Sequence, residues 1–212
     1  MQIAELWRYP VKSLAGEPLT TVQLTAHGLV GDRIVHVRNG RDRVLTARTK
    51  PGLLALHGTW DAVGGEPRID GRPWHDPVAA EAVRRAAGED ARLVHDESLD
   101  RFDVLPLLVA TDGAVAALGV DRRRLRPNVV IAGVEGLAER AWAGRRLRVG
   151  GAVIRVAEVR ERCVMTTYDP DTQAQDHAVL RRIVKEFGGR IALDCDVVQP
   201  GRLALGDPVE LL

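Results

Sequence analysis

Short runs of alternating hydrophobic and polar residues recur along the chain, and they are typical of β-strands with one buried face. Residues 3–8 and residues 19–24 alternate in this way. The runs IVHVR and VLTAR flank an Asn-Gly dipeptide, which readily adopts positive φ, so residues 34–48 are predicted to form a β-hairpin. Arg33 and Arg48 would then lie near the open end of this hairpin.

Three segments carry helix signals instead. Asp76 and Pro77 predict an N-cap and a first helical residue ahead of VAAEAVRRAAG. A second short helix, AVAALG, follows the buried strand VLPLLVAT, and either Thr111 or Asp112 can cap it. The clearest helix covers residues 177–187, whose apolar side chains share one face.

The second half of the chain is dense in further strand signals. The segments NVVIAG, RRLRVG and AVIRVAEV each predict a strand, and two more strands are expected near residues 191–198 and 208–212. An Asp-Gly turn at residues 70–71 marks another turn in the first half. Many short strands with few helices indicate a mainly β, α+β protein that contains a barrel.

Composition supports a folded β protein and excludes several functions. Hydrophobic residues make up 45% of the 212 residues, but only two Phe, four Trp and two Tyr are present, so the core must consist of Val, Leu, Ile and Ala. Thirty basic and 29 acidic residues give a formal net charge of +1. The chain therefore lacks the strong positive charge of a typical nucleic-acid-binding protein.

The sequence lacks the common targeting signals and the common nucleotide-binding, metalloprotease and serine-hydrolase motifs. The N-terminus shows no signal peptide, and no apolar run is long enough to span a membrane, so a soluble cytoplasmic protein is expected. No GxxxxGK, strand-linked GxGxxG, HExxH or GxSxG motif is present. The six histidines are scattered without metal-ligand spacing, and two cysteines are too few for a disulfide framework.

Cys163 is the residue with the most distinctive chemical setting. It follows Arg162 and precedes the apolar pair Val164-Met165, just after the predicted strand AVIRVAEV. A neighbouring guanidinium favours a thiolate, which is a soft metal ligand and a nucleophile. On these local grounds a buried structural cysteine is the more common outcome, and a functional thiolate is the alternative. Cys195 has no cationic neighbour and is expected to pack in the core.

Two other polar segments carry weaker signals. Asp169 and Asp171 lie close to Cys163 and could relay protons, although Asp-Pro-Asp is ordinary turn chemistry, which is the stronger interpretation. The basic run at residues 121–128 is expected to be a loop that leads into a strand. Arg126 and Asn128 could project toward a pocket from its end, whereas residues 122–124 would remain in water.

Taken together, segments spread along nearly the whole chain resemble the MOSC family of molybdenum-cofactor domains. The family includes the C-terminal domain of molybdenum-cofactor sulfurase and the amidoxime-reducing components. The resemblance depends on the order and spacing of these segments. The segments are Tyr9-Pro10-Val11-Lys12-Ser13, Gly31-Asp32-Arg33, Leu45-Thr46-Ala47-Arg48, Leu125-Arg126-Pro127-Asn128-Val129-Val130, WAGRRLRVG at residues 142–150, Arg162-Cys163 and Gly206-Asp207-Pro208-Val209.

The resemblance implies two domains and a cofactor site between them. Residues 1–95 would form a smaller N-terminal β-rich domain, and residues 96–212 would form the MOSC β-barrel. The molybdenum cofactor, in its molybdopterin form, would lie in the cleft between them, with Cys163 as the catalytic residue and the protein's sulfur ligand to molybdenum. This expectation reverses the local interpretation of Cys163.

The same resemblance implies a set of cofactor contacts whose charges and amides suit a phosphate and a pterin ring. They are Lys12, Ser13, Arg33, Arg48, Thr111, Arg126, Asn128, Arg162 and Cys163. Two positions depart from the family pattern. Thr111-Asp112 matches the family's Ser-rich position only loosely, and Glu161 stands where relatives often carry Pro before the Arg-Cys pair.

The implied activity is a molybdenum-dependent oxidoreductase that reduces N-hydroxylated or N-oxygenated small molecules. The chain has too few cysteines for an iron–sulfur cluster and no flavin fingerprint, so electrons are expected from a separate protein of the ferredoxin, flavodoxin or flavin reductase type. Three alternatives stay open at this point: a non-catalytic cofactor carrier, a sulfur carrier with a persulfide on Cys163, and a MOSC-like fold that no longer binds cofactor.

Overall fold

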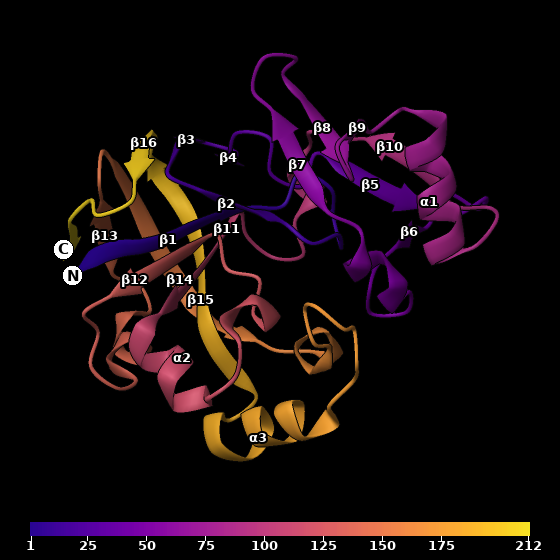
Figure 1. Ribbon diagram of the computed structural model, residues 1–212. Helices are drawn as coiled ribbons and strands as arrows, with labels where there is room; N and C mark the ends of the chain where they lie inside the picture. Colours follow the sequence, from indigo (N-terminus) through magenta and orange to yellow (C-terminus); the bar gives the residue numbers. More distant parts are fainter.

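An eight-stranded sheet forms the larger of two lobes in the computed structural model, which describes residues 1–212 (Figure 1). Its strands, in their order across the sheet, are β17 (Val209–Leu211), β13 (Arg146–Val149), β14 (Ala152–Glu161), β15 (Arg190–Gln199), β11 (Leu107–Thr111), β12 (Val129–Ala132), β1 (Gln2–Arg8) and β2 (Glu17–Leu19). Neighbouring strands are antiparallel except for β11 and β12, which are parallel.

This sheet curls until its two sides meet near the chain termini. The amide of Ile3 donates to the carbonyl of Asp207 at 2.9 Å, and the amide of Val209 donates to the carbonyl of Met1 at 2.9 Å. The contact is a single bridge between Gln2 and Pro208 and not a full ladder. The predicted mainly β, α+β fold is confirmed, whereas the expected barrel is a strongly curled sheet without a closed ladder.

A second sheet of three short strands covers the same core as the large sheet. Its strands in order are β16 (Gly201–Ala204), β3 (Thr21–Thr25) and β4 (Gly28–Leu29). Val22, Leu24, Leu29 and Leu203 from these strands belong to a core of 20 buried residues that also includes Cys195. Cys195 is therefore a packing residue, as expected.

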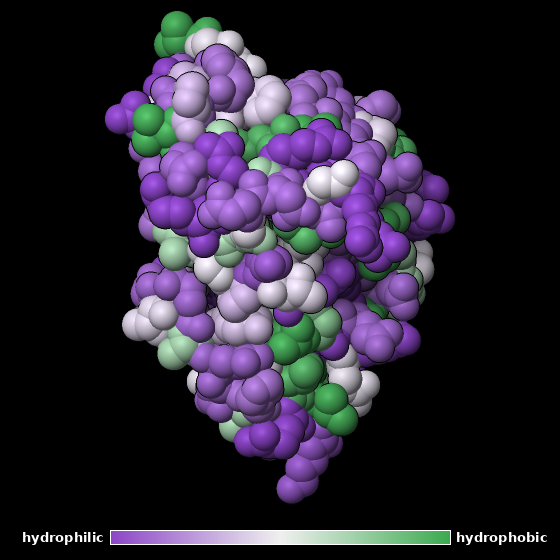
Figure 2. Space-filling model, turned by 90° about the vertical axis from the view of Figure 1, so that its right-hand side faces the viewer, coloured by the Kyte–Doolittle hydropathy of each residue, from purple (hydrophilic) through white to green (hydrophobic).

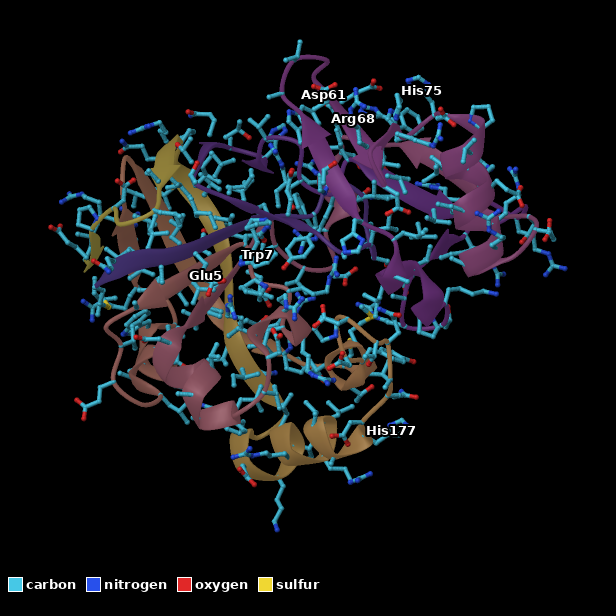
Figure 3. The ribbon with its side chains drawn as sticks, viewed as in Figure 1. Glu5, Trp7, Asp61, Arg68, His75 and His177 are labelled. Carbon is cyan, nitrogen blue, oxygen red and sulfur yellow. The ribbon has the colours of Figure 1, made fainter.

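The smaller lobe has two further sheets and one helix. One sheet has the order β10 (Arg92–His95), β5 (Val35–Arg38) and β6 (Val44–Leu45), and the other has the order β7 (Gly58–Asp61), β8 (Glu66–Ile69) and β9 (Arg72–Pro73). Helix α1 (Pro77–Ala87) packs beside them (Figure 1). In the β7–β8 hairpin, Arg68 pairs with Asp61 at 2.6 Å, and both side chains lie together in Figure 3.

The expected hairpin at residues 34–48 is present but short. Val37 pairs with Leu45 and Arg38 with Val44, and the chain then turns, with the amide of Thr49 donating to the carbonyl of Thr46 at 3.1 Å. Arg48 therefore lies in a turn and not on a strand. Strand β10 was not predicted, because its pairing with β5 joins segments more than 50 residues apart.

Neither lobe is formed by one continuous segment of the chain. The first 29 residues contribute Ile3, Leu6 and Leu24 to the core of the larger lobe, whereas the core of the smaller lobe includes residues between Val11 and Ala91 together with Tyr168. The expected division of the chain into domains of residues 1–95 and 96–212 stays a prediction. In space, the chain crosses between the lobes more than once.

Side-chain caps fix the starts of all three helices. Asp76 caps α1 by accepting from the amide of Val78 at 2.7 Å, and Asp176 caps α3 (His177–Phe187) by accepting from the amide of Ala178 at 2.8 Å. Helix α2 (Asp112–Leu118) is capped by Thr111. Five short 3₁₀ helices complete the fold: Pro51–Ala55, Leu99–Arg101, Arg122–Arg124, Ala138–Trp142 and Val164–Thr167.

The helices and the surface were compared with the features of membrane-spanning segments. None of the helices is both long enough and apolar enough to cross a bilayer. On the side of the molecule shown in Figure 2, hydrophilic residues predominate, and hydrophobic residues form only small groups among them.

Glu139 is a buried acidic residue in the larger lobe. It is 0% exposed, and neither carboxylate oxygen has a hydrogen-bond partner. Burial raises the pKa of its carboxyl above the ordinary value. The folded state therefore holds this proton more tightly than the unfolded state does. The resulting contribution to stability is present at low pH and is lost as the pH rises above about 4.5, through the folded-state pKa.

Replacing Glu139 with Gln is therefore expected to stabilise the protein at neutral and alkaline pH. The gain in the free energy of unfolding should be about 1 kcal/mol, because the variant buries no charge. Urea denaturation of both proteins at about pH 5 and about pH 8 measures it. The advantage of the variant should be larger at the higher pH, and an equal difference at both pH values would contradict this account.

Candidate functional site

Eight of the nine residues expected to contact a cofactor line one cleft of about 410 Å³. These residues are Lys12, Ser13, Arg33, Arg48, Arg126, Asn128, Arg162 and Cys163. The cleft lies where the smaller lobe, through residues near Lys12 and Arg48, faces strands β14 and β15 of the larger lobe. Its size is in the range of small-molecule and cofactor sites.

Cys163 lies at the end of β14, where the strand passes into the 3₁₀ helix Val164–Thr167. The amide and hydroxyl of Thr166 donate to the carbonyl of Cys163 at 3.1 and 3.0 Å, which fixes the backbone at this corner. The side chain is half-buried and forms no disulfide. Its sulfur is therefore free to act as a ligand in the cleft.

Guanidinium groups lie beside the Cys163 sulfur. Burial lowers the pKa of Arg48, but Asp103 and the sulfur of Cys163 raise it to above its ordinary value. Burial lowers the pKa of Arg162 to about 10, although Cys163 opposes that change. Arg162 donates to the carbonyl of Leu125 at 2.8 Å, while its buried Nε has no partner. The cleft thus contains a desolvated cation with an unused donor.

Asp103 organises the cations on one side of the cleft. Its carboxylate accepts from Lys12 at 2.9 Å and from Arg48 at 2.6 Å, and Arg160 lies 3.8 Å away. Burial raises the pKa of Asp103, but Lys12, Arg48 and Arg160 lower it to below the ordinary value. Sequence reasoning did not identify Asp103 or Arg160, because no local signal separates either residue from the many other charged residues of the chain.

Asp32 is buried behind the cleft and contacts two of its lining residues, Arg33 and Asn128. It is 0% exposed, accepts from the amide of Tyr9 at 2.8 Å, and pairs with Arg33. The side-chain amide of Asn128 donates to Asp32 at 3.2 Å and accepts from the amide of Leu108 at 3.2 Å. Asn128 therefore lines the cleft, but its polar atoms are engaged within the protein.

The ring of Tyr9 makes cation–π contacts with two arginines of the cleft. The guanidinium carbons of Arg126 and Arg33 lie 4.3 and 4.9 Å from the ring centroid. The Tyr9 hydroxyl donates to the carbonyl of Pro127 at 3.2 Å, and burial raises the pKa of Tyr9 to about 12. Burial also lowers the pKa of Arg126 to about 10. The second desolvated guanidinium of the cleft is thus held in place by an aromatic ring.

Three of the seven non-glycine residues with positive φ line the cleft. Ser13, Arg33 and Arg126 have φ values of 76°, 56° and 57°, in the left-handed region that favours glycine. The hydroxyl of Ser13 accepts from the amide of Ala47 at 3.1 Å. Such conformations persist where surrounding contacts enforce them, and they are common at binding sites.

Thr111 does not lie in the cleft. It is 0% exposed, and its hydroxyl accepts from the amide of Ala114 at 3.1 Å as the N-cap of α2. Asp112, the other candidate cap, instead accepts from the amides of Gly133 and Val134 at 2.7 and 3.0 Å. The expectation that Thr111 contacts a cofactor is therefore corrected: the hydroxyl is used by the helix.

A Thr111→Val substitution should accordingly affect stability and not ligand content. Loss of the cap is expected to lower the free energy of unfolding by about 1 kcal/mol. The variant should keep whatever cofactor the native chain carries, measured after identical purification. Loss of cofactor from a folded Thr111→Val protein would show that this residue contributes to the site after all.

The arginines of the basic run after α2 form ion pairs with carboxylates from other parts of the chain. Arg123 pairs with Asp171 at 2.7 Å, and Arg124 pairs with Asp169 at 2.9 Å. Arg122 pairs with Glu5 on β1, where Trp7 also donates to Glu5 at 2.7 Å (Figure 3). The expectation that residues 122–124 stay in water holds for Arg122 and Arg123, whose side chains are 38% and 33% exposed. Arg124 is only 11% exposed, because its guanidinium is held by Asp169 and by the carbonyl of Thr167.

The Asp-Pro-Asp segment forms a turn, as its stronger interpretation predicted. A carboxylate oxygen of Asp169 accepts from the amides of Asp171 and Thr172 at 3.1 and 3.0 Å. Neither aspartate lines the cleft that contains Cys163. Their carboxylates are committed to the turn and to arginines, so they are structural.

The protein side chains do not form a complete metal site. No group of three or more His, Cys, Asp or Glu residues is arranged to hold a metal ion. His75 and His177 lie at opposite ends of the molecule in Figure 3. A metal bound at Cys163 would therefore need its other ligands from a cofactor, and the surrounding guanidiniums would suit an anionic one.

Comparison with known families agrees with this geometry. The MOSC domain matches residues 94–210, and the MOSC N-terminal beta barrel domain matches residues 1–90. The chain belongs to the MOSC family. This result confirms the resemblance found in the sequence.

Relatives of this MOSC protein carry names that describe an activity. It is 26% identical to mitochondrial amidoxime-reducing component 1 from Homo sapiens, across 99% of this chain and 82% of the relative. It is also 26% identical to mitochondrial amidoxime reducing component 2 from Macaca fascicularis, across 82% of this chain and 68% of the relative. The YUAD protein from Bacillus subtilis has a similar fold, with a TM-score of 0.53 at 14% identity, over 99% of this chain and 94% of that one.

Proposed function

We propose that this MOSC protein binds a molybdenum cofactor in the cleft, with Cys163 as the protein ligand to molybdenum, and reduces N-hydroxylated or N-oxygenated small molecules. The observation that carries the proposal is a free, half-buried cysteine in a cleft that is also lined by Arg48 and by the half-buried Arg126 and Arg162. The names of its amidoxime-reducing relatives support the reaction class.

The residues of the cleft suit an anionic, pterin-containing group. Arg126 and Arg162 are cations that burial has partly stripped of water, and an anion would compensate that cost. The unused Nε of Arg162 is a donor without an acceptor. Lys12 and Arg48 add charge at the smaller lobe. A phosphate is the part of the cofactor that these donors would hold.

When bound, the cofactor would supply two-electron redox chemistry with transfer of an oxygen atom. The protein would contribute position and charge. Cys163 would anchor the metal end at the corner after β14, and Arg48 and Arg162 would compensate negative charge near its sulfur. Asp103 would hold Lys12 and Arg48 in place, so that their donors face the bound group in a fixed geometry.

Electrons would come from a separate protein of the ferredoxin, flavodoxin or flavin reductase type, in the cytoplasm. Of the two cysteines, Cys195 is fully buried in the core, where burial raises the pKa of its thiol. Cys163 alone faces the cleft. The chain therefore presents one thiol to the cleft, and the reducing equivalents would be supplied by a partner.

Turnover with an artificial donor separates the enzyme from its alternatives. Protein from a host that makes molybdenum cofactor would be given reduced methyl viologen and benzamidoxime, and formation of benzamidine would be measured. Benzamidine formation supports the oxidoreductase. Bound molybdenum and pterin without turnover would indicate a cofactor carrier. Sulfide released from metal-free protein by a thiol reductant would indicate a persulfide carrier on Cys163.

A further inference from the structure

Glu161 is an exposed carboxylate at the edge of the cleft, at the last position of β14. It lies two residues before Cys163, so it flanks the corner that presents the sulfur. No Lys, Arg or His nitrogen lies within ion-pairing distance of its oxygens. It is an uncompensated negative charge in a cleft that is otherwise rich in arginine.

The other three carboxylates of the cleft all have cationic partners. The pairs are Asp103 with Lys12 and Arg48, Glu158 with Arg190, and Asp194 with Arg160. Arg190 lies directly opposite Glu161 in the register of β14 and β15, but its guanidinium pairs with Glu158 at 3.4 Å. Glu161 is thus left free even though a cation lies across the ladder.

We propose that Glu161 forms a subsite for a cationic amidine or guanidine group of a ligand that binds in the cleft beside Cys163. This inference rests on the proposed function and names the ligand class that the site prefers. A cationic ligand meets repulsion at Lys12, Arg48 and Arg162 and attraction at Glu161. The charge distribution therefore places the positive end of a ligand beside Glu161.

The chemistry of the proposed reduction creates such a cation. An amidoxime takes up two electrons from the reductant and two protons from solvent; the N–O bond breaks, and water and an amidine are formed. The amidine is a much stronger base than the amidoxime, so it takes up one further proton and becomes an amidinium. Glu161 can hold that cation through a charge-assisted hydrogen bond. Neutral products, such as amides formed from hydroxamic acids, gain nothing from it.

Binding of benzamidine and of neutral benzamide to the purified full-length chain tests the subsite without any turnover. Amide chemical-shift changes in NMR titrations would give both dissociation constants for the native protein, for Glu161→Gln and for Glu210→Gln. Glu210 lies on β17, is exposed and pairs with Arg148, so its substitution changes net charge equally but outside the cleft.

The native chain should prefer benzamidine to benzamide, and Glu161→Gln should weaken benzamidine binding by about fivefold while leaving benzamide binding unchanged. Glu210→Gln should behave as the native chain does. Equal benzamidine affinity in the native and Glu161→Gln proteins, or no preference for benzamidine over benzamide, would overturn the proposal.

A kinetic measurement separates this inference from the proposed function. With reduced methyl viologen, Glu161→Gln should raise the inhibition constant of benzamidine by about fivefold, with little change in the kcat for benzohydroxamic acid. If no N-hydroxylated compound is reduced but benzamidine binding still depends on Glu161, the proposed function fails and the subsite stands. If turnover occurs and benzamidine inhibits both proteins equally, the subsite fails alone.

Discussion

Cys163→Ala is expected to lower the rate of benzamidoxime reduction by about a thousandfold or more, equivalent to about 4 kcal/mol of transition-state stabilisation. The substitution removes the only cysteine that faces the cleft and with it the proposed protein ligand to the metal. Initial rates with reduced methyl viologen, normalised to folded protein, measure the effect. Cys163→Ser serves as a second variant, because it keeps the side-chain shape with a harder ligand atom.

Cys195→Ala is the matched control for this result. Cys195 is the other cysteine, but it is 0% exposed in the core and does not line the cleft. This control should lose some stability and retain turnover per folded molecule. Undiminished turnover in Cys163→Ala would contradict the assignment of Cys163.

Asp32→Ala is expected to lower the free energy of unfolding by about 3 kcal/mol. The native carboxylate is fully buried and serves three donors: the amide of Tyr9, the guanidinium of Arg33 and the side-chain amide of Asn128. Its removal leaves a partly buried cation and two other donors without an acceptor, which costs far more than the loss of a surface ion pair. Urea denaturation followed by circular dichroism measures the change.

Glu210→Ala is a suitable comparison, since Glu210 pairs with Arg148 on the surface at 2.9 Å, with a side chain that is 58% exposed. This variant should change the free energy of unfolding by less than about 0.5 kcal/mol. Equal effects of the two substitutions would show that the Asp32 network does not hold the cleft together.

Local signals in the sequence were sufficient to predict the elements that depend on contacts between nearby residues. The cap Asp76, the helix at residues 177–187 and the β5–β6 hairpin follow from residues only a few positions apart. Strand β10 and the place of β1 in the large sheet were beyond such signals. Both depend on pairing with distant segments, as when Leu6 of β1 pairs with Val129 of β12.

The residues of the cleft were also difficult to predict from local signals, because they come from distant parts of the chain. Local reasoning favoured a structural role for Cys163, and only the resemblance to a family placed it in a cofactor cleft with its arginines. Asp103 and Asp32 were missed as organising residues, because a carboxylate that accepts from donors in distant segments looks like any other charged residue in a loop. Thr111 was misplaced because its hydroxyl suits a cofactor and a helix cap equally well, and burial decides between the two.

Metal and pterin analysis of the native chain, purified from a host that makes molybdenum cofactor, is the direct test of a cofactor bound through Cys163. We expect about one molybdenum and one pterin per chain, with molybdenum content reduced in Cys163→Ala and unchanged in Cys195→Ala. Well-folded native protein that carries neither molybdenum nor pterin would contradict this expectation.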